Sequence, residues 1–284
     1  MSTDGWTLHP AAALRIGPGF HLADLDPRST PGYAGSKTEG ARDLAEGVPA
    51  LDGLQERLFA QSVAGTATRS VLLVLQGMDT SGKGGIVRHV VGSVDPQGVE
   101  LASFKKPTAE ELSHDFLWRI AKRLPEPGKI GVFDRSHYED VLIGRVRSLA
   151  PPEEIERRYG AIEQFEKDAA ARGIRVVKVM LHISKDEQKA RLSERLERPE
   201  KYWKYNPGDI DERMLWEQYA AAYQVMLERT STAVAPWFVV PADRKWFARL
   251  AVQQLLLGAL RDIDPQWPPA DYDVEAEQRR LAAS

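Results

Sequence analysis

The stretch LLVLQGMDTSGKGG, residues 72–85, joins an apolar run to a glycine-rich turn. A strand buried in a parallel sheet reads as a continuous apolar run, and ligands bind at the turns that follow such strands. The turn nearly matches G-x-x-x-x-G-K-[ST], in which backbone amides and the lysine bind phosphate and the last hydroxyl binds Mg²⁺. Gly77, Gly82 and Lys83 are in register, but Gly84 occupies the hydroxyl position. The stretch therefore predicts a phosphate site whose metal ligand lies elsewhere.

The turn supplies the other groups that a bound phosphate needs. Its glycines let the backbone curl until several amides face one anion, and Lys83 can reach the outer phosphates. The alternative is a glycine-rich turn that binds nothing. Besides Lys83, we expect phosphate contacts from Gly77, Thr80, Ser81, Gly82, Gly84 and Gly85.

Two aspartates are candidates for the missing metal ligand. Asp79 lies inside the turn, and Asp134 ends the apolar run of IGVFDRSHYED, residues 130–140. Mg²⁺, or Mn²⁺ in its place, prefers carboxylate oxygens. Asp134 alone is ambiguous, because many strands end in an Asp that serves as a turn or cap residue. Together with the glycine-rich turn, the pair predicts a metal site made by Asp79 and Asp134.

From residue 70 onward, short β-rich runs alternate with longer amphipathic stretches, which predicts an α/β fold with a parallel sheet. The expected strands are 71–76, 99–104, 130–134, 176–183 and 237–241. The expected helices are 51–61, 84–91, 109–123, 152–172, 185–198, 210–229 and 244–262. Residues 1–50 contain turn signals without periodicity, so we interpret them as an extension draped over the core or partly mobile. Residues 51–284 form the expected catalytic domain.

Composition excludes several classes of protein. The chain of 284 residues has no cysteine, which excludes disulfides and thiolate chemistry. Its formal net charge is −3, so it lacks the basic field of a nucleic-acid binder. The longest apolar runs have strand length and the N-terminus does not resemble a signal peptide, so we expect a cytoplasmic protein without a membrane partner.

Basic residues cluster locally despite the negative net charge. Arg135 directly follows Asp134, where it would either neutralise a transferring phosphoryl group or pair with Asp79, Glu139 or Asp140. Further basic residues are expected to form a track for phosphates: Lys105, Lys106, Arg119 and Lys122. A third group lies in the expected lid, residues 185–215: Arg191, Arg195, Arg198, Lys201 and Lys204. The alternative for this group is a solvated helix with pairs such as Glu194–Arg198.

Aromatic side chains are also frequent in the second half of the chain. They could stack on a nucleotide base, but buried packing is the better default. The residues in question are Trp203, Tyr205, Trp216, Trp237 and Trp246.

Five blocks of this sequence together resemble the family-2 polyphosphate kinases over about residues 51–261. They are GMDTSGKGG (77–85), FKKPTAEELSHDFLWR (104–119), FDRSHYEDVL (133–142), RPEKYWKYNPGDIDERMLWEQY (198–219) and APWFVVPADRKW (235–246). The resemblance implies a three-layer α/β/α P-loop kinase fold with a helical lid. It also implies reversible, Mg²⁺-dependent phosphoryl transfer between inorganic polyphosphate and a nucleotide.

The resemblance assigns roles to individual residues. It places the loop Asp and Lys on Asp79 and Lys83, and the second Asp-Arg pair on Asp134 and Arg135. A glycine after the loop Lys is normal in this family. Lid residues with catalytic or phosphate-binding roles fall on Arg191, Arg195, Lys201 and Lys204. SHYEDVL resembles the branch that accepts both AMP and ADP, which makes Glu139 the residue for acceptor choice.

We therefore expect phosphoryl transfer from polyphosphate to AMP and ADP, with ATP as a product and guanine nucleotides as further candidates. The resemblance also implies a homo-oligomer, a dimer or tetramer. Two alternatives remain. One is an ATP-dependent kinase for a small nucleotide or nucleoside, and the other is a nucleotide or polyanion sensor without turnover.

Overall fold

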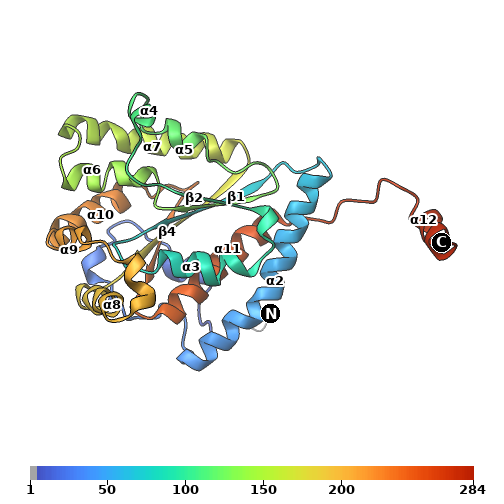
Figure 1. Cartoon of the computed structure of the whole chain (residues 1–284), viewed down its shortest axis with the longest axis horizontal. Coiled ribbons are helices and arrows are strands. Elements are labelled where there is room, and N and C mark those ends of the chain that lie inside the picture. Colours follow the sequence, from blue (N-terminus) through green and yellow to red (C-terminus); the bar gives the residue numbers. More distant parts are fainter. Residues whose placement is uncertain (1–4) are drawn as a thin grey trace.

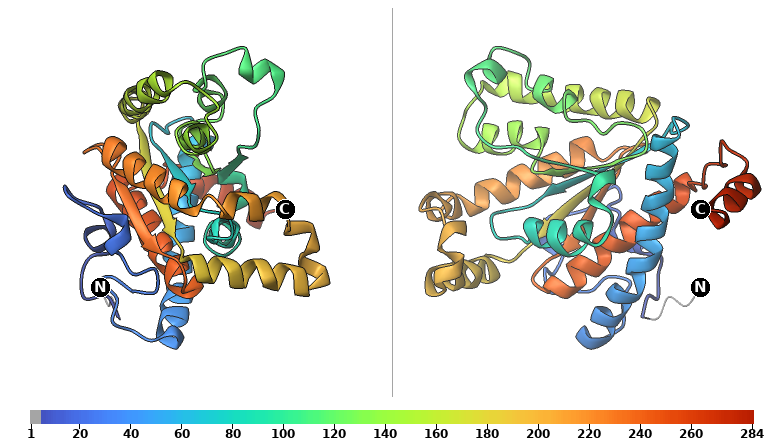
Figure 2. Two further views of the ribbon diagram at one scale, coloured as in Figure 1. Left: turned by 90° about the vertical axis from the view of Figure 1, so that its left-hand side faces the viewer. Right: turned by 45° about the vertical axis from the view of Figure 1, so that its right-hand side comes forward.

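A computed structural model describes residues 5–284 and shows a parallel sheet between two layers of helices (Figures 1 and 2). The sheet has the strand order β2-β3-β1-β4-β5. Its strands are β1 (Ser70–Gln76), β2 (Val99–Ser103), β3 (Ile130–Asp134), β4 (Ile174–His182) and β5 (Trp237–Pro241). All neighbouring strands pair in parallel. The predictions of these five strands and of an α/β fold are confirmed.

The central strand β1 divides the core into two halves because successive side chains of a strand point to opposite faces. Val71, Leu73 and Leu75 pack with helices α2 (Lys37–Val63), α3 (Lys83–His89) and α11 (Lys245–Ile263). Leu72 and Val74 pack with helices α7 (Pro152–Ala171) and α10 (Trp216–Thr230). Every residue of β1 is buried, as the continuous apolar run indicated.

Helices α3, α7, α8 (Lys185–Glu197) and α11 agree with the predicted helices to within about two residues at each end. Apart from α2 and α10, the remaining helices of the described residues are short. They are α1 (Pro10–Leu14), α4 (Ala109–Leu112), α5 (Trp118–Ala121), α6 (Ile143–Val146), α9 (Gly208–Arg213) and α12 (Val274–Ala282). Short 3₁₀ helices are η1 (Leu22–Asp24), η2 (Val91–Ser93), η3 (Pro96–Gly98), η4 (His137–Asp140) and η5 (Pro199–Lys204).

Two expected helices were wrong as continuous elements. The stretch 109–123 is divided into α4 and α5, because the Asp115 carboxylate accepts a hydrogen bond from the Leu117 amide and turns the chain between them. The stretch 210–229 is divided into α9 and α10 at Leu215, whose backbone is not helical. Both breaks reorient side chains that a single helix would have aligned.

The helix expected at 51–61 begins earlier than predicted. A capping box between Ser36 and Glu39 starts α2 at Lys37, and the helix continues through Pro49. The early part of this helix was not predicted because Gly and Pro in this stretch have low helix propensity. Helix α2 therefore runs through the boundary at residue 50 that separated the expected extension from the expected domain.

The segment before α2 covers one edge of the sheet. Arg15 forms an antiparallel bridge with Phe238 of β5, and the side chains of Leu14, Leu22 and Tyr33 are buried. An edge strand covered in this way is no longer open to pairing with another chain. Residues 1–4 of the expected extension lie outside the described residues.

The C-terminal helix α12 lies apart from the body at the end of an extended connection (Figure 1 and the right-hand view of Figure 2). None of its residues is buried. Within residues 5–284, we find no helix that combines the length and the apolar character needed to cross a bilayer.

Candidate functional site

The candidate site lies at the carboxyl edge of the sheet, where β1 and β3 end side by side. Leu75 of β1 pairs with Asp134 of β3, so the glycine loop, residues 77–83, begins next to Asp134. In open α/β sheets this edge is where ligands bind. The sheet register thus brings together four predicted site residues from two segments: Asp79, Lys83, Asp134 and Arg135.

The backbone of the loop explains which glycines it requires. Gly77 has φ 146°, and a Cβ there would lie 2.7 Å from the Leu181 carbonyl oxygen. Gly82 also has a positive φ, of 115°. Thr80 and Arg135 adopt φ values of 65° and 64°, which is costly for residues with side chains and is typical of functional sites. At Gly84, by contrast, a Cβ would meet no atom within 4 Å.

The lysine of the loop forms hydrogen bonds with the backbone of the same loop. The Lys83 ammonium donates hydrogen bonds to the carbonyl oxygens of Gly77 at 2.6 Å and Met78 at 3.3 Å. Burial lowers the pKa of Lys83, and the nearby Arg135 lowers it further. The hydroxyls of Thr80 and Ser81 are buried and have no hydrogen-bond partner within residues 5–284. An ammonium group and two unpaired hydroxyls therefore gather in one loop.

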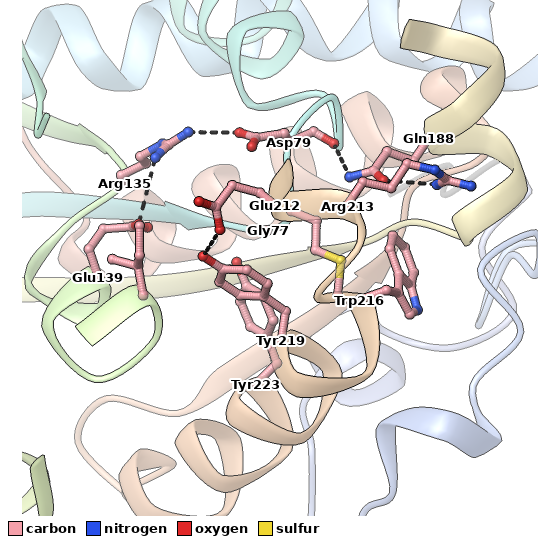
Figure 3. A pocket seen from close by; sticks show the side chains of 12 residues that line it. Gly77, Asp79, Arg135, Glu139, Gln188, Glu212, Arg213, Trp216, Tyr219 and Tyr223 are labelled. Carbon is pink, nitrogen blue, oxygen red and sulfur yellow. Dashed lines mark hydrogen bonds and ion pairs between the residues drawn. The ribbon is translucent and has the colours of Figure 1, made fainter. Parts of the chain in front are cut away.

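An ion pair joins this loop to the end of β3. Arg135 donates a hydrogen bond to Asp79 at 2.7 Å and lies 3.7 Å from Glu139 (Figure 3). Burial would lower the pKa of Arg135, but the carboxylates of Glu139 and Asp79 outweigh it and keep that pKa above its ordinary value. Two of the three expected partners of Arg135 are thus present. The third, Asp140, pairs with Arg119 and Arg158 instead.

Glu139 lies in the same constellation. Burial raises the pKa of the Glu139 carboxyl, while Arg135 and Lys83 oppose that rise. The Gln76 amide lies 3.0 Å from both Ser136 Oγ and Glu139 Oε1, and with its nitrogen toward the carboxylate both contacts are hydrogen bonds. Glu139 is therefore held on two sides, by an amide and by a guanidinium.

A buried polar cluster fixes the 3₁₀ turn η4 that carries Glu139. Lys178 of β4 donates hydrogen bonds to Glu166 of α7 at 2.6 Å and to the Tyr138 hydroxyl at 2.8 Å. The Tyr138 hydroxyl donates in turn to Glu166 at 2.7 Å. Although burial acts against the charge, Lys178 and His137 hold the pKa of Glu166 below its ordinary value. Because Tyr138 precedes Glu139, this cluster sets the orientation of the turn.

A cleft opens beside Asp79, Arg135 and Glu139 (Figure 3). It encloses about 480 Å³ of space, part of which is open solvent. Its remaining walls come from α6, α8, α9 and α10 and from the start of the loop: Gly77, Met78, Ile143, Gln188, Glu212, Arg213, Trp216, Tyr219 and Tyr223.

Most of these wall residues were not singled out from the sequence. Trp216 was interpreted as a packing residue, yet it lines the cleft. Tyr219 donates a hydrogen bond to Glu212, and Arg213 donates to Gln188 at 3.0 Å, so the walls are tied together. The available signal was the block DERMLWEQY, residues 211–219, whose chemistry-bearing side chains could not be placed without the break between α9 and α10.

The lid arginines hold protein groups in this structure. Arg191 is buried and donates to the carbonyl oxygens of Thr80 at 2.8 Å and Ala242 at 2.6 Å. It thereby joins the loop to the connection between β5 and α11. Arg195 donates to the Lys204 carbonyl oxygen at 2.9 Å and to Asp209 at 3.2 Å.

The other basic residues differ in their surroundings. Lys105 and Lys106 are exposed, whereas Arg119 is buried and donates to the Lys105 carbonyl oxygen at 2.8 Å. Arg119 also lies 3.7 Å from Glu111 and from Asp140, so two carboxylates already balance its charge. In the lid, Lys201 pairs with Glu194, and the Lys204 ammonium lies 4.9 Å from the centre of the Trp203 ring.

The donor set of the site suits Mg²⁺. Within residues 5–284, the Asp134 carboxylate forms no hydrogen bond or ion pair, although it lies near Lys83. No group of three or more acidic or histidine side chains that could hold a metal occurs in that range. Two carboxylates fit Mg²⁺, which keeps several water ligands and takes its remaining oxygens from substrate phosphates.

Comparison with known proteins gives consistent matches over most of the chain. The model of the family polyphosphate kinase 2 matches residues 36–268. An AMP/ADP-polyphosphate phosphotransferase of Meiothermus ruber is 43% identical over 256 residues, which cover 90% of this chain and 94% of that protein. An ADP-polyphosphate phosphotransferase of Rhodopseudomonas palustris is 43% identical, with coverages of 78% and 79%. The crystal structure of polyphosphate kinase 2 from Arthrobacter aurescens TC1 superposes with a TM-score of 0.96 at 55% identity over 100% of both chains.

Proposed function

Because the chain belongs to the polyphosphate kinase 2 family, we propose that it transfers phosphoryl groups from inorganic polyphosphate to AMP and ADP. The observation that carries the proposal is the meeting of Asp79, Lys83, Asp134 and Arg135 at one edge of the sheet beside a cleft. Phosphoryl transfer needs charge neutralisation and positioning more than covalent chemistry. Two carboxylates and two cations around one loop supply both.

The proposal includes Mg²⁺, held by Asp79 and Asp134. When bound, the ion neutralises charge on the transferring phosphoryl oxygens and on the acceptor phosphate. Asp134 is free to take this role, while Asp79 shares its carboxylate with Arg135. Lys83 would exchange its contacts with loop carbonyls for phosphate oxygens, and Arg135 would orient the group in transfer. The acceptor is a phosphate oxygen that already carries negative charge, so the reaction needs no strong general base.

In this proposal the cleft holds the nucleotide acceptor. Glu139 stands at its border, where an additional phosphate of ADP would bring more negative charge toward a carboxylate than AMP does. Glu139 is therefore our candidate for acceptor choice. Guanine nucleotides belong to the acceptors to be tested. The proposal also places the protein in the cytoplasm, where these nucleotides are available.

The test is to incubate the purified protein with Mg²⁺, polyphosphate and each of AMP, ADP, GMP and GDP, and to measure the products by chromatography. We expect ADP from AMP and ATP from ADP. The competing function, an ATP-dependent small-nucleotide kinase, predicts that ATP serves as donor where polyphosphate does not. Binding of both substrates without any product would instead identify a sensor.

Self-association is also part of the proposal, and α12 supports it. The first turn of α12 carries Glu275 and Glu277, and its last turn carries Arg279 and Arg280. Within one copy these residues form the exposed pairs Glu275–Arg279 and Glu277–Arg280, which would be exchanged for contacts with a second helix. An antiparallel pair with the α12 of a second copy would place each acidic turn against a basic turn. We expect light scattering to show more than one copy for the full chain. The double variant Arg279→Glu/Arg280→Glu should weaken association, and mixing it with Glu275→Lys/Glu277→Lys should restore it; an unchanged mass throughout would contradict the pairing.

A further inference from the structure

Two arginines and a histidine lie beside the glycine loop and are not part of the cleft. Arg88 and His89 belong to the last turn of α3, and Arg249 belongs to α11. The walls of the cleft include no residue from α3 or α11 among the described residues. Within residues 5–284, neither Arg88 nor Arg249 forms a hydrogen bond or an ion pair. Most other arginines near the site are balanced by carboxylates or carbonyl oxygens, as Arg119, Arg135 and Arg191 show.

Arg88 acts electrostatically on Arg249, both arginines act on His89, and no acidic group among the described residues contributes to either shift. Burial lowers the pKa of Arg249, and Arg88 lowers it further. Burial also lowers the pKa of His89, with additional contributions from Arg249 and Arg88. The charges of Arg88 and Arg249 therefore create a local positive potential, and a bound anion would relieve their repulsion.

Two glycines, which have no side chains, lie between Lys83 of the loop and the group formed by Arg88, His89 and Arg249. Gly84 and Gly85 follow Lys83 directly, and a Cβ at Gly84 would meet no atom within 4 Å. A Cβ at Gly85 would lie 3.9 Å from the Arg249 guanidinium. The two glycines therefore leave an open surface that leads from the loop lysine to Arg249. On α3, Arg88 lies one turn beyond this surface.

The direction of this surface matches the geometry of phosphoryl transfer. In such reactions the attacking and leaving oxygens lie roughly in line on opposite sides of the transferring phosphorus. The acceptor side is the cleft with Asp79, Arg135 and Glu139. The leaving group is the rest of the donor, which must extend away from the cleft, and the elements beyond the loop are α3 and α11.

We propose that Arg249 and Arg88 bind the donor chain beyond its reacting end, with its phosphate units lying across Gly84 and Gly85. The proposal rests on the proposed function, because it assigns the path of the polyphosphate used there. It also gives Gly84 a role: the position that carries a hydroxyl in related loops is kept bare for a chain of phosphates. The competing path is the expected track of Lys105, Lys106 and Arg119.

The test compares donors of different length. Steady-state rates of Arg88→Gln, Arg249→Gln and the wild type are measured with long-chain polyphosphate and with tripolyphosphate, at saturating ADP. We expect the KM for the long donor to rise roughly 10-fold in each variant, the loss of about one charge-assisted contact. The kcat, the KM for ADP and the KM for tripolyphosphate should change much less. Arg172→Gln, the same charge change at an exposed position on α7's end, should have no effect on any of them.

The outcomes separate the two proposals. If the wild type transfers no phosphoryl group from polyphosphate, the proposed function is wrong. If the wild type is active and both variants keep its KM for long polyphosphate, the inference is wrong. A rise of that KM in Lys105→Gln/Lys106→Gln, without one in the arginine variants, would place the donor on the competing track. Thermal unfolding of each variant verifies the fold, and Arg88, being exposed, offers a variant that should fold normally.

Discussion

Arg135 and Asp79 form an ion pair of 2.7 Å that joins the end of β3 to the glycine loop, 56 residues apart in the chain. Asp134, the neighbour of Arg135, has no such partner within residues 5–284. The two aspartates therefore differ in structural role although we propose the same ion for both. This difference makes their substitutions distinguishable.

We expect Asp79→Asn and Asp134→Asn each to lower kcat on the order of 10²–10³-fold, because charge stabilisation at the reacting group is lost. Asp134→Asn should leave the melting temperature unchanged, whereas Asp79→Asn should lower it slightly by weakening the pair with Arg135. Rates measured over a range of Mg²⁺ concentrations check the metal role. Asp271→Asn, in the exposed C-terminal connection, is the matched control. A near-normal rate in either variant would remove that aspartate from the metal site.

Arg135→Gln should lower turnover with both acceptors by at least about 10²-fold, because we propose that this preorganised cation faces the transferring group. It should also leave Asp79 and Glu139 without their shared cation. Arg135→Lys keeps the charge but cannot donate to both carboxylates in the same way, so partial recovery is expected. Equal losses in the two variants would indicate that guanidinium geometry, and not charge, is what the site requires.

The raised pKa of Glu139 predicts how its replacement acts. Burial, the main cause, favours the protonated carboxyl in the folded state, so the folded state binds more protons than the unfolded state between the two pKa values. Stability associated with this group therefore falls as pH rises from the ordinary value of 4.5 through the folded pKa.

Glu139→Gln should accordingly be more stable than the wild type at pH 8, and the advantage should disappear near pH 4. Urea unfolding at several pH values measures this difference. If Glu139 also governs acceptor choice, the same variant changes the ratio of kcat/KM for AMP and ADP. An unchanged ratio would show that Glu139 affects stability but does not select the acceptor.

The Lys178–Glu166 pair predicts a large effect on stability. Lys178→Met leaves the Glu166 carboxylate buried with fewer partners, which should cost about 3–5 kcal/mol of unfolding free energy. The double variant Lys178→Met/Glu166→Leu removes both charges and should cost less than the single change. Denaturant titration tests this, and a double variant as unstable as the sum of both single variants would argue against coupling.

The loop glycines should respond in opposite directions to alanine. Gly77→Ala forces a side chain into a positive φ and against the Leu181 carbonyl, with an expected cost of about 2–5 kcal/mol. Gly84→Ala meets no atom and lies within α3, so it should stabilise the fold by about 0.4–1 kcal/mol. Calorimetry of the two variants measures the contrast. Destabilisation by Gly84→Ala would mean that the open surface there is smaller than the structure shows.

Most of the sheet could be predicted from the sequence because its strands, apart from the half-exposed β2, are short and mainly apolar. The continuous burial of β1 and the aspartate at the end of β3 are direct consequences of local pattern. Helix α2 could not be bounded in this way, since its start depends on the Ser36–Glu39 cap and its middle contains Pro49. The break between α9 and α10 also left no strong local signal, although it directs Trp216 to the cleft.

The candidate site likewise has a part that the sequence predicts and a part that it does not. Asp79, Lys83, Asp134 and Arg135 are close in space because parallel strands end together, which follows from topology alone. Apart from Glu187, which lies four residues before Arg191 on the same helix, the partners of Arg119 and Arg191 could not be foreseen, because they are carbonyl oxygens and acids from other segments. Sequence shows that a cation is present, but only tertiary structure shows what balances it.

The hydrogen bonds of Arg191 limit which part of the expected lid can move. Its guanidinium bonds to the loop and to the start of the α11 connection, so the first two turns of α8 are anchored to the body. A swing of the whole segment 185–215 would break four hydrogen bonds to carbonyl oxygens at once. If the expected lid moves, its pivot therefore lies after Arg191, and an arm made of the end of α8, η5 and α9 must also release the bonds of Arg213 to Lys185 and Gln188. Closure over a substrate would then move only the residues after Arg191, and the geometry of the glycine loop would stay unchanged.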